Sequence, residues 1–165
     1  MDDRSYVIRL FTSRWVRDGY RRHIKRVEKI ENRELVKRWM KKRDQMKDKK
    51  TIWTFHGTPK KESIVSIAEN GFDITKLGSN KKNTGDYGAG IYLSEYSSTA
   101  IKYCDMKGGI ILCRVLVGKQ YVCPGDTPRG IKLKEGYDSH TSPDGRREIV
   151  IFDSDCILPC YAIYV

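Results

Sequence analysis

The sequence predicts an α+β fold, in which helices come first and a strand-rich body follows. Helical spacing of apolar residues marks residues 1–50, whereas short apolar runs between Gly and Pro turns mark residues 51–165. The run IILCRVLV at 110–117 is almost continuously apolar, which is typical of a central strand. Strands and helices do not alternate as in a doubly wound sheet, and this favours α+β. We therefore expect one domain, 1–165, with a basic lead-in over 1–50 and a β-rich body over 51–165.

The N-terminal third has helical periodicity at both of its ends. Apolar residues three or four positions apart predict a helix over 5–17 that Gly19 ends. Residues 20–30 fit a strand or a helix. Asn32 precedes a charged run over 34–50, whose polarity predicts a surface helix. The apolar residues on its inner side are Leu35, Trp39 and Met46.

From residue 51 onward, the pattern changes to short strands between turns. Residues 51–56, TIWTFH, predict a strand that the Gly-Thr-Pro break at 57–59 ends. A helix over 60–70 follows, with Gly71 as its left-handed cap. Two polar stretches, 73–86 and 125–146, are predicted to be long loops. The remaining predicted elements are strand 91–95, helix 97–104, and strands 110–117, 119–123, 148–153 and 160–165.

The cysteines and histidines do not form a metal-ligand pattern. The five cysteines have no CxxC spacing and lie apart from His23, His56 and His140, so we predict no metal site. Free thiols suit a reducing compartment, and we expect a cytoplasmic or nuclear protein. No run of about 18 apolar residues exists, and the N-terminus is acidic where a signal peptide is basic. We expect no membrane partner.

The net charge of +11 lies almost entirely in the N-terminal third. Residues 1–50 contain 18 Lys and Arg against 8 Asp and Glu, a net of +10. A basic surface of this kind can dock nucleic acid or an acidic protein. Lys and Arg alternate there with Glu and Asp, which also fits a solvated helix face. Both interpretations stay open.

The stretch GDYGAGIYLSEYSSTAIKYC, residues 85–104, is the first candidate for a ligand wall. Its glycines, which include Gly90, let a backbone approach a ligand closely. Tyr92 and Tyr103 are eleven residues apart and are able to close on a planar ring from two sides. An ordinary turn before a core strand is the alternative. GDYGAG does not satisfy GxGxxG, which disfavours a dinucleotide site of the Rossmann type. No P-loop or hydrolase signature is present either.

Three polar residues lie at strand edges beside turns, and each has a structural explanation when taken alone. His56 fits a satisfied core imidazole, Tyr92 a packing aromatic, and Glu148 a solvated charge.

Together, the positions resemble the catalytic domain of the poly(ADP-ribose) polymerase superfamily, the diphtheria-toxin-like ADP-ribosyltransferases. Four motifs carry the resemblance in the family's order, over roughly residues 20–165. They are HGT at 56–58, GAGIYL at 88–93, SSTAIKYC at 97–104 and EIVIF at 148–152. The resemblance implies two packed, antiparallel-rich sheets with flanking helices. It also implies transfer of ADP-ribose from NAD, the co-substrate, to an acceptor with release of nicotinamide.

The resemblance further implies roles for single residues. His56 would bond the adenosine ribose, and the Gly57 backbone would hold the nicotinamide carboxamide. Tyr103 would stack on the nicotinamide ring while Tyr92 closes the pocket, and Glu148 would bond the 2′-hydroxyl of the nicotinamide ribose. The implied catalytic set is His56, Tyr92 and Glu148. The implied NAD-binding set is His56, Gly57, Thr58, Gly90, Tyr92, Ala100 and Tyr103.

Two matters stay open on the sequence. Ala100 stands where many relatives carry a serine that bonds the carboxamide, which predicts weaker nicotinamide binding. The resemblance favours a protein acceptor, the chain itself included. The compact chain leaves little surface to accept a polymer, which favours single-unit transfer, although Glu148 also permits polymer synthesis. The alternatives are an enzyme of this fold that acts on nucleic acid, and an inactive module that binds NAD or ADP-ribose.

Overall fold

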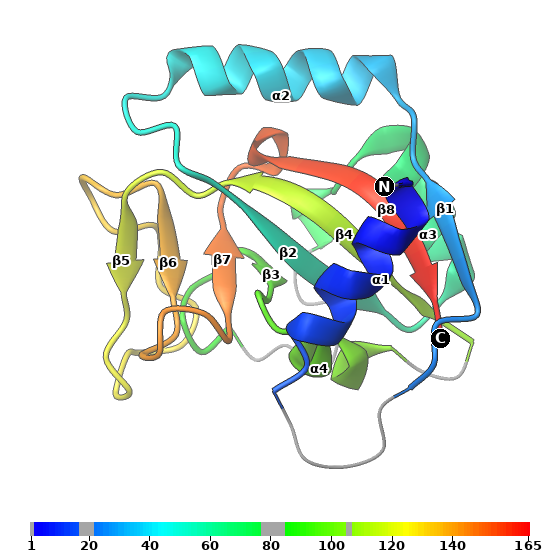
Figure 1. The fold of residues 1–165 in the computed structure, drawn as a ribbon. Coiled ribbons are helices and arrows are strands. Elements are labelled where there is room, and N and C mark those ends of the chain that lie inside the picture. The colour runs from blue at the N-terminus through cyan, green and yellow to red at the C-terminus, as the bar shows by residue number, and fades with distance from the viewer. Residues whose placement is uncertain (1, 17–21, 77–84, 105–106) are drawn as a thin grey trace.

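A computed structural model describes residues 2–16, 22–76, 85–104 and 107–165 (Figure 1). The chain forms two four-stranded sheets with helices around them, which confirms the α+β class and the two sheets. The first sheet has the order β1-β8-β4-β2, and the second β3-β7-β6-β5. Every described pairing is antiparallel except that of β5 with β6.

The first sheet contains the long strands. In sheet order its members are β1 Arg26–Lys29, β8 Ile157–Tyr164, β4 Gly109–Leu116 and β2 Thr51–Thr58. The second sheet is built from three-residue strands. These are β3 Ile91–Leu93, β7 Ile149–Ile151, β6 Ser139–Thr141 and β5 Gln120–Val122.

Four α-helices are described, and short 3₁₀ turns join some of the elements. The α-helices are α1 Asp3–Ser13, α2 Arg33–Gln45, α3 Lys61–Asn70 and α4 Ser97–Ala100. The 3₁₀ turns are Ile74–Lys76, Ile101–Tyr103, which continues α4, and Ser154–Cys156. Among the described residues, no helix has the length and apolar character needed to cross a bilayer.

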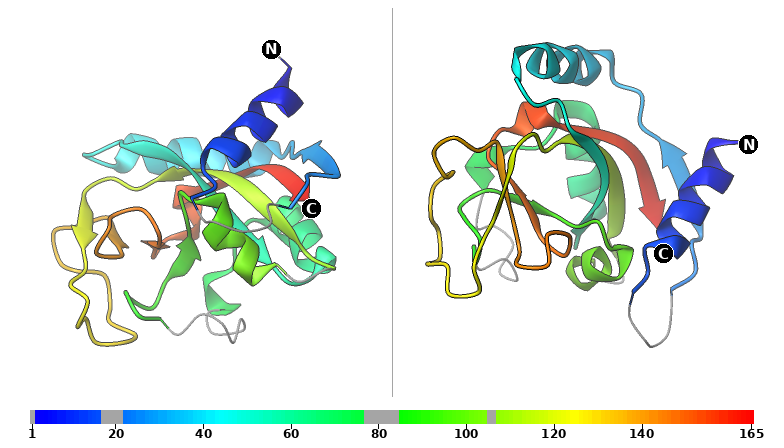
Figure 2. Two further views of the ribbon diagram at one scale, coloured as in Figure 1. Left: turned by 60° about the horizontal axis from the view of Figure 1, so that its bottom comes forward. Right: turned by 60° about the vertical axis from the view of Figure 1, so that its left-hand side comes forward.

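The central strand β4 explains the apolar run at 110–117, because both of its faces are buried. On one face, Ile110 and Leu112 pack with Phe11 of α1. On the other face, Ile111 and Cys113 join a core shared with α2, α3 and the second sheet. Figure 2 shows α1 on one side of the first sheet and the second sheet on the other side. Alternate residues of one strand therefore supply two cores.

The N-terminal helices begin at side-chain caps. The Asp2 carboxylate accepts a hydrogen bond from the Ser5 amide at 2.8 Å, and the Asn32 side chain accepts bonds from the first amides of α2. The predicted helix over 34–50 ends at Gln45. Its predicted inner residues are buried: Leu35, Trp39 and Met46. The predicted stop at Gly19 lies outside the described residues.

One predicted boundary, at Gly57, and one predicted cap conformation, at Gly71, are wrong. β2 does not end before Gly57, because β4 pairs with it along its whole length, up to Thr58 opposite Gly109. Glycine is compatible with the strand at position 57, and the absence of a side chain there leaves space for the Ala100 carbonyl. Gly71 does end α3 at a positive φ of 81°, but its ψ of −176° is extended, so the predicted left-handed cap is not formed.

The predicted loop over 125–146 contains a strand, β6, that was not predicted from the sequence. β6 consists of Ser139, His140 and Thr141, all buried, and it pairs with both β5 and β7. Its polar side chains find partners inside the fold; the Ser139 hydroxyl, for example, donates to the Val117 carbonyl at 2.7 Å. A strand of buried polar residues has no apolar pattern to reveal it.

Candidate active site

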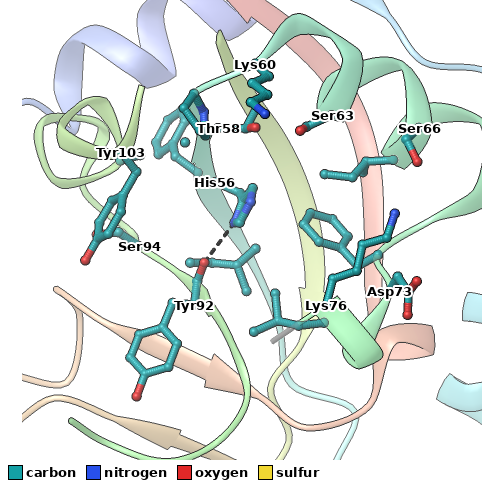
Figure 3. A pocket seen from close by; sticks show the side chains of 18 of the residues that line it. His56, Thr58, Lys60, Ser63, Ser66, Asp73, Lys76, Tyr92, Ser94 and Tyr103 are labelled. Carbon is teal, nitrogen blue, oxygen red and sulfur yellow. Dashed lines mark hydrogen bonds between the residues drawn. The ribbon is translucent and has the colours of Figure 1, made fainter. Parts of the chain in front are cut away.

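All eight predicted site residues line one pocket of about 510 Å³. The pocket lies between β2, β3 and α3, with Tyr103 and Glu148 at one end. The residues are His56, Gly57, Thr58, Gly90, Tyr92, Ala100, Tyr103 and Glu148. Figure 3 shows the two tyrosines on one side of His56, and Ser63, Ser66, Asp73 and Lys76 on the other. The pocket is therefore elongated, with His56 between its two ends.

The imidazole of His56 is fixed in one tautomer. Its Nδ1 lies 2.9 Å from the carbonyl oxygen of Tyr92, and because a carbonyl only accepts, Nδ1 carries the proton. Burial lowers the pKa of His56, so the ring is neutral at physiological pH. The remaining nitrogen, Nε2, is then a hydrogen-bond acceptor. The Phe72 ring packs almost perpendicular to the imidazole ring, with centroids 4.9 Å apart. A hydroxyl of a sugar is a suitable donor for this nitrogen.

Gly57 presents backbone groups along the open edge of the first sheet. β2 is the last strand of that sheet, and Phe55 exchanges two backbone hydrogen bonds with Ser94 beyond its edge. Since strand geometry repeats every second residue, the N–H and C=O of Gly57 point the same way. A side chain is excluded at this position, because a Cβ on Gly57 would overlap the carbonyl oxygen of Ala100. The donor and acceptor of Gly57 are complementary to a planar carboxamide.

The segment 85–90 is held close to β7 and to Tyr92. A Cβ on Gly90 would come within 2.7 Å of the Ile151 carbonyl oxygen, so glycine is needed for this approach. The Tyr92 hydroxyl donates to the Gly88 carbonyl at 2.8 Å and accepts from the Tyr87 amide at 2.9 Å. The phenol of Tyr92 is thus fixed by the glycine segment itself.

Glu148 is the carboxylate of the pocket. Its amide donates to the Ser142 hydroxyl at 2.9 Å, and its carbonyl accepts from the Ser142 amide, so its backbone is held on both sides. The Tyr103 hydroxyl donates to its Oε1 at 3.5 Å. Burial raises the pKa of Glu148 to about 7, against the smaller opposing effects of Tyr103 and nearby cations. Burial and the charge of Glu148 raise the pKa of Tyr103 to about 12, so the phenol keeps its proton.

The pKa of Glu148 predicts a pH dependence of activity. Only the ionised carboxylate stabilises positive charge, so kcat/KM for NAD should rise with pH through about 7 and level off above it. Initial rates measured from pH 5.5 to 8.5 at constant ionic strength check this. A profile that is flat between pH 6 and 8 would contradict the assignment of Glu148.

Ala100 ends α4, lines the pocket and lies against Gly57. Replacing Ala100 with serine should supply one hydrogen-bond donor to a carboxamide bound at Gly57. We expect the affinity for nicotinamide to rise about 2- to 10-fold, as measured by titration calorimetry. Ala68→Ser, on α3 outside the pocket, is the control. Equal affinities of the A100S variant and the wild type would show that the carboxamide does not reach this position.

The polar end of the pocket is not predicted by any motif of the sequence. It is lined by Lys60 just before α3, by Ser63 and Ser66 on α3, and by Asp73 and Lys76 in the connection that follows (Figure 3). The predicted loop 73–86 supplies two of these residues; its residues 77–84 lie outside the described part of the chain. A spacing of three between Ser63 and Ser66, in a helix that directly follows the histidine motif, is the signal that could have indicated a polar face.

His, Cys, Asp and Glu are the side chains that commonly bind a metal ion in proteins. Within the described ranges, no group of three or more His, Cys, Asp or Glu side chains is placed to hold a metal ion.

The pocket therefore joins a neutral imidazole acceptor, an open strand edge, two tyrosines and a half-buried carboxylate. The family model described as the poly(ADP-ribose) polymerase catalytic domain matches residues 5–164. This match spans nearly all of the 165 residues. The chain belongs to the poly(ADP-ribose) polymerase catalytic-domain family, whose activity is ADP-ribosyl transfer from NAD.

Proposed function

We propose that this chain transfers single ADP-ribose units from NAD to protein side chains, its own included, and releases nicotinamide. The observation that carries the proposal is the half-buried carboxylate of Glu148, which lies beside Tyr103 in the pocket that Gly57 also lines. A carboxylate at this place is positioned to act on the sugar next to a carboxamide bound at Gly57.

The proposed placement of NAD runs along the pocket. The carboxamide bonds the Gly57 N–H and C=O, and the nicotinamide ring lies against Tyr103, with Tyr92 closing the same end. A hydroxyl of the adenosine ribose donates to Nε2 of His56. The adenine then lies toward α3, among the polar residues opposite the tyrosines. Glu148 accepts a hydrogen bond from the 2′-hydroxyl of the nicotinamide ribose.

The chemistry follows from this placement. The bond between ribose C1′ and the nicotinamide nitrogen breaks, and the electron pair of that bond leaves with neutral nicotinamide. Positive charge grows on the ribose, and the Glu148 carboxylate stabilises it in a site of low dielectric. The acceptor oxygen or nitrogen forms the new bond to C1′ and loses its proton. Binding energy at His56 and Gly57 holds C1′ in place for this attack.

Single-unit transfer is favoured by the connection that leads into Glu148. The Asp144 carboxylate accepts bonds from the Ser142 hydroxyl and from the amides of Arg146 and Arg147, which closes residues 142–147 into a tight turn. A turn this short offers little surface to seat an already attached ADP-ribose chain.

A nucleic-acid acceptor is the second candidate, supported by the charges around Glu148. Lys102 and Arg147 are both exposed, and both are near enough to lower the pKa of Glu148. Together with the basic residues 1–50, they would attract an anionic acceptor such as a terminal phosphate.

The unpaired thiols of Cys113, Cys123, Cys156 and Cys160 support a reducing compartment, and we infer a cytoplasmic or nuclear protein.

The proposal is tested by incubating the protein with labelled NAD, alone, with a protein mixture and with oligonucleotides. Mass spectrometry of the modified products then reports the acceptor residue and the number of units per site. We expect label on protein side chains, one unit per site. Label on oligonucleotides alone would favour the second candidate, and consumption of NAD in none of the reactions would contradict both.

A further inference from the structure

His140 lies in the middle of β6, fully buried and outside the pocket lining. Both of its ring nitrogens bond backbone groups. Nε2 accepts from the amide of Lys134 at 2.9 Å, and Nδ1 lies 2.7 Å from the carbonyl oxygen of Tyr87. Because an amide only donates and a carbonyl only accepts, the proton is on Nδ1. Burial lowers the pKa of His140, which keeps the ring in this neutral form.

Further hydrogen bonds connect Tyr87 to residues that line the pocket. The Tyr87 amide donates to the hydroxyl of Tyr92 at 2.9 Å, and the Tyr92 carbonyl accepts from Nδ1 of His56 at 2.9 Å. One series of hydrogen bonds and covalent links therefore runs from Lys134, outside the pocket, through His140 and Tyr87 to the two pocket residues.

The glycine segment also rests directly on the imidazole. A Cβ on Gly88 would come within 3.1 Å of Nδ1 of His140 and 2.7 Å of the Phe152 ring, and Gly88 has a φ of 129°, which glycine tolerates best. The imidazole itself is wedged between Phe152 and Tyr121, with centroids 4.7 and 5.4 Å away. The position of residues 85–90 thus depends on the shape of His140 as well as on its bonds.

We propose that His140 is a positioning residue for the nicotinamide end of the pocket. It fixes the Tyr87 carbonyl, and through Tyr87 it sets the position of the Tyr92 phenol. The inference rests on the proposed placement of nicotinamide between Gly57 and the tyrosines. The adenosine end, formed by α3 and by Nε2 of His56, lies beyond Tyr92 at the far end of this series, so we expect it to be affected less than the nicotinamide end.

Two substitutions separate the two bonds of His140. Asparagine places an amide N–H near the position of Nδ1 and keeps the donor to Tyr87. Glutamine places a carbonyl oxygen near the position of Nε2 and keeps only the acceptor for Lys134. We expect His140→Gln to weaken nicotinamide about 5- to 10-fold, while His140→Asn retains nicotinamide affinity within about 2-fold.

Nicotinamide affinity is measured by titration calorimetry, with AMP as the probe of the adenosine end, at a temperature well below the Tm of each variant. AMP affinity should change less than about 2-fold in both variants. Equal losses of nicotinamide affinity in the two variants, or equal losses of nicotinamide and AMP, would reduce His140 to a purely structural role and overturn the proposal. A wild type that does not bind nicotinamide would instead overturn the proposed site, and this inference with it.

The wild-type protein offers a second measurement that needs no variant. If the series of contacts transmits order, saturating nicotinamide should slow hydrogen exchange of the Lys134 amide, although Lys134 lies outside the pocket lining. An unchanged exchange rate at Lys134, with protection confined to residues of the pocket, would contradict the proposal.

Discussion

Replacing Glu148 with glutamine is expected to lower kcat for ADP-ribosyl transfer at least about 100-fold. Glutamine keeps the shape of the side chain and a hydrogen-bond acceptor for the ribose, but it lacks the negative charge that opposes the developing charge on the sugar. The KM for NAD should therefore change much less than kcat. Steady-state rates of nicotinamide release, over a range of NAD concentrations, separate the two quantities.

The same substitution, which lowers activity, should raise the stability of the fold. The pKa of Glu148 is about 7 in the fold, above its ordinary value of 4.5, so the folded protein holds a proton that the unfolded chain has already released. The contribution of this group to stability is complete below pH 4.5 and is lost as the pH rises through 7. Above pH 7, Glu148→Gln should unfold at a free energy about 1–3 kcal/mol higher than the wild type.

Denaturant titrations at pH 5 and pH 8 measure this difference, which should be larger at pH 8. Glu69→Gln is the matched control, because Glu69 lies exposed on α3 outside the pocket lining. Full transfer activity in Glu148→Gln would remove the carboxylate from the mechanism. Loss of activity together with loss of stability at pH 8 would mean that glutamine disturbs the fold.

Replacing Gly57 with alanine is expected to abolish measurable nicotinamide binding and to destabilise the fold by about 1–3 kcal/mol. The added methyl group would overlap the Ala100 carbonyl oxygen and approach the Tyr103 Cβ within 3.1 Å, so β2 and α4 must move apart. This movement displaces the strand edge from the stacking tyrosine. Both parts of the nicotinamide site are then altered at once.

Calorimetry with nicotinamide and thermal unfolding measure the two effects of Gly57→Ala. Gly125→Ala is the control, because no atom lies within 4 Å of a Cβ placed on Gly125. Wild-type affinity in the Gly57→Ala variant would mean that the carboxamide binds elsewhere in the pocket.

The sequence was most informative where local chemistry and tertiary structure agree. The run at 110–117 is apolar on both faces because β4 is buried on both faces. The charged periodic run after Asn32 predicts a helix, and α2 forms there with Asn32 as its cap. The predicted site residues line one pocket because the family's motifs lie beside Gly57 and Gly90, where a Cβ has no space.

The sequence was least informative where structure depends on distant partners. The residues of β6 are polar, and their burial is favourable because each side chain bonds a backbone group, as His140 does with Lys134 and Tyr87. The end of β2 was misplaced because a glycine near a proline normally ends a strand. The pairing of Thr58 with Gly109 overrides that tendency here. Such long-range pairings are not visible in local patterns.

The open edge of β2 has a consequence for how any ligand is recognised. A carboxamide has the same donor and acceptor as a peptide group, so a bound nicotinamide would act as a one-residue strand that extends the first sheet beyond Gly57. A bound carboxamide would then bond the free edge of β2 as another strand would. Because the unfolded chain has no such edge, the bound ligand would raise the free energy of unfolding. Recognition of this kind reads the amide and not the rest of the ring, so small planar amides without a sugar should compete for the same edge.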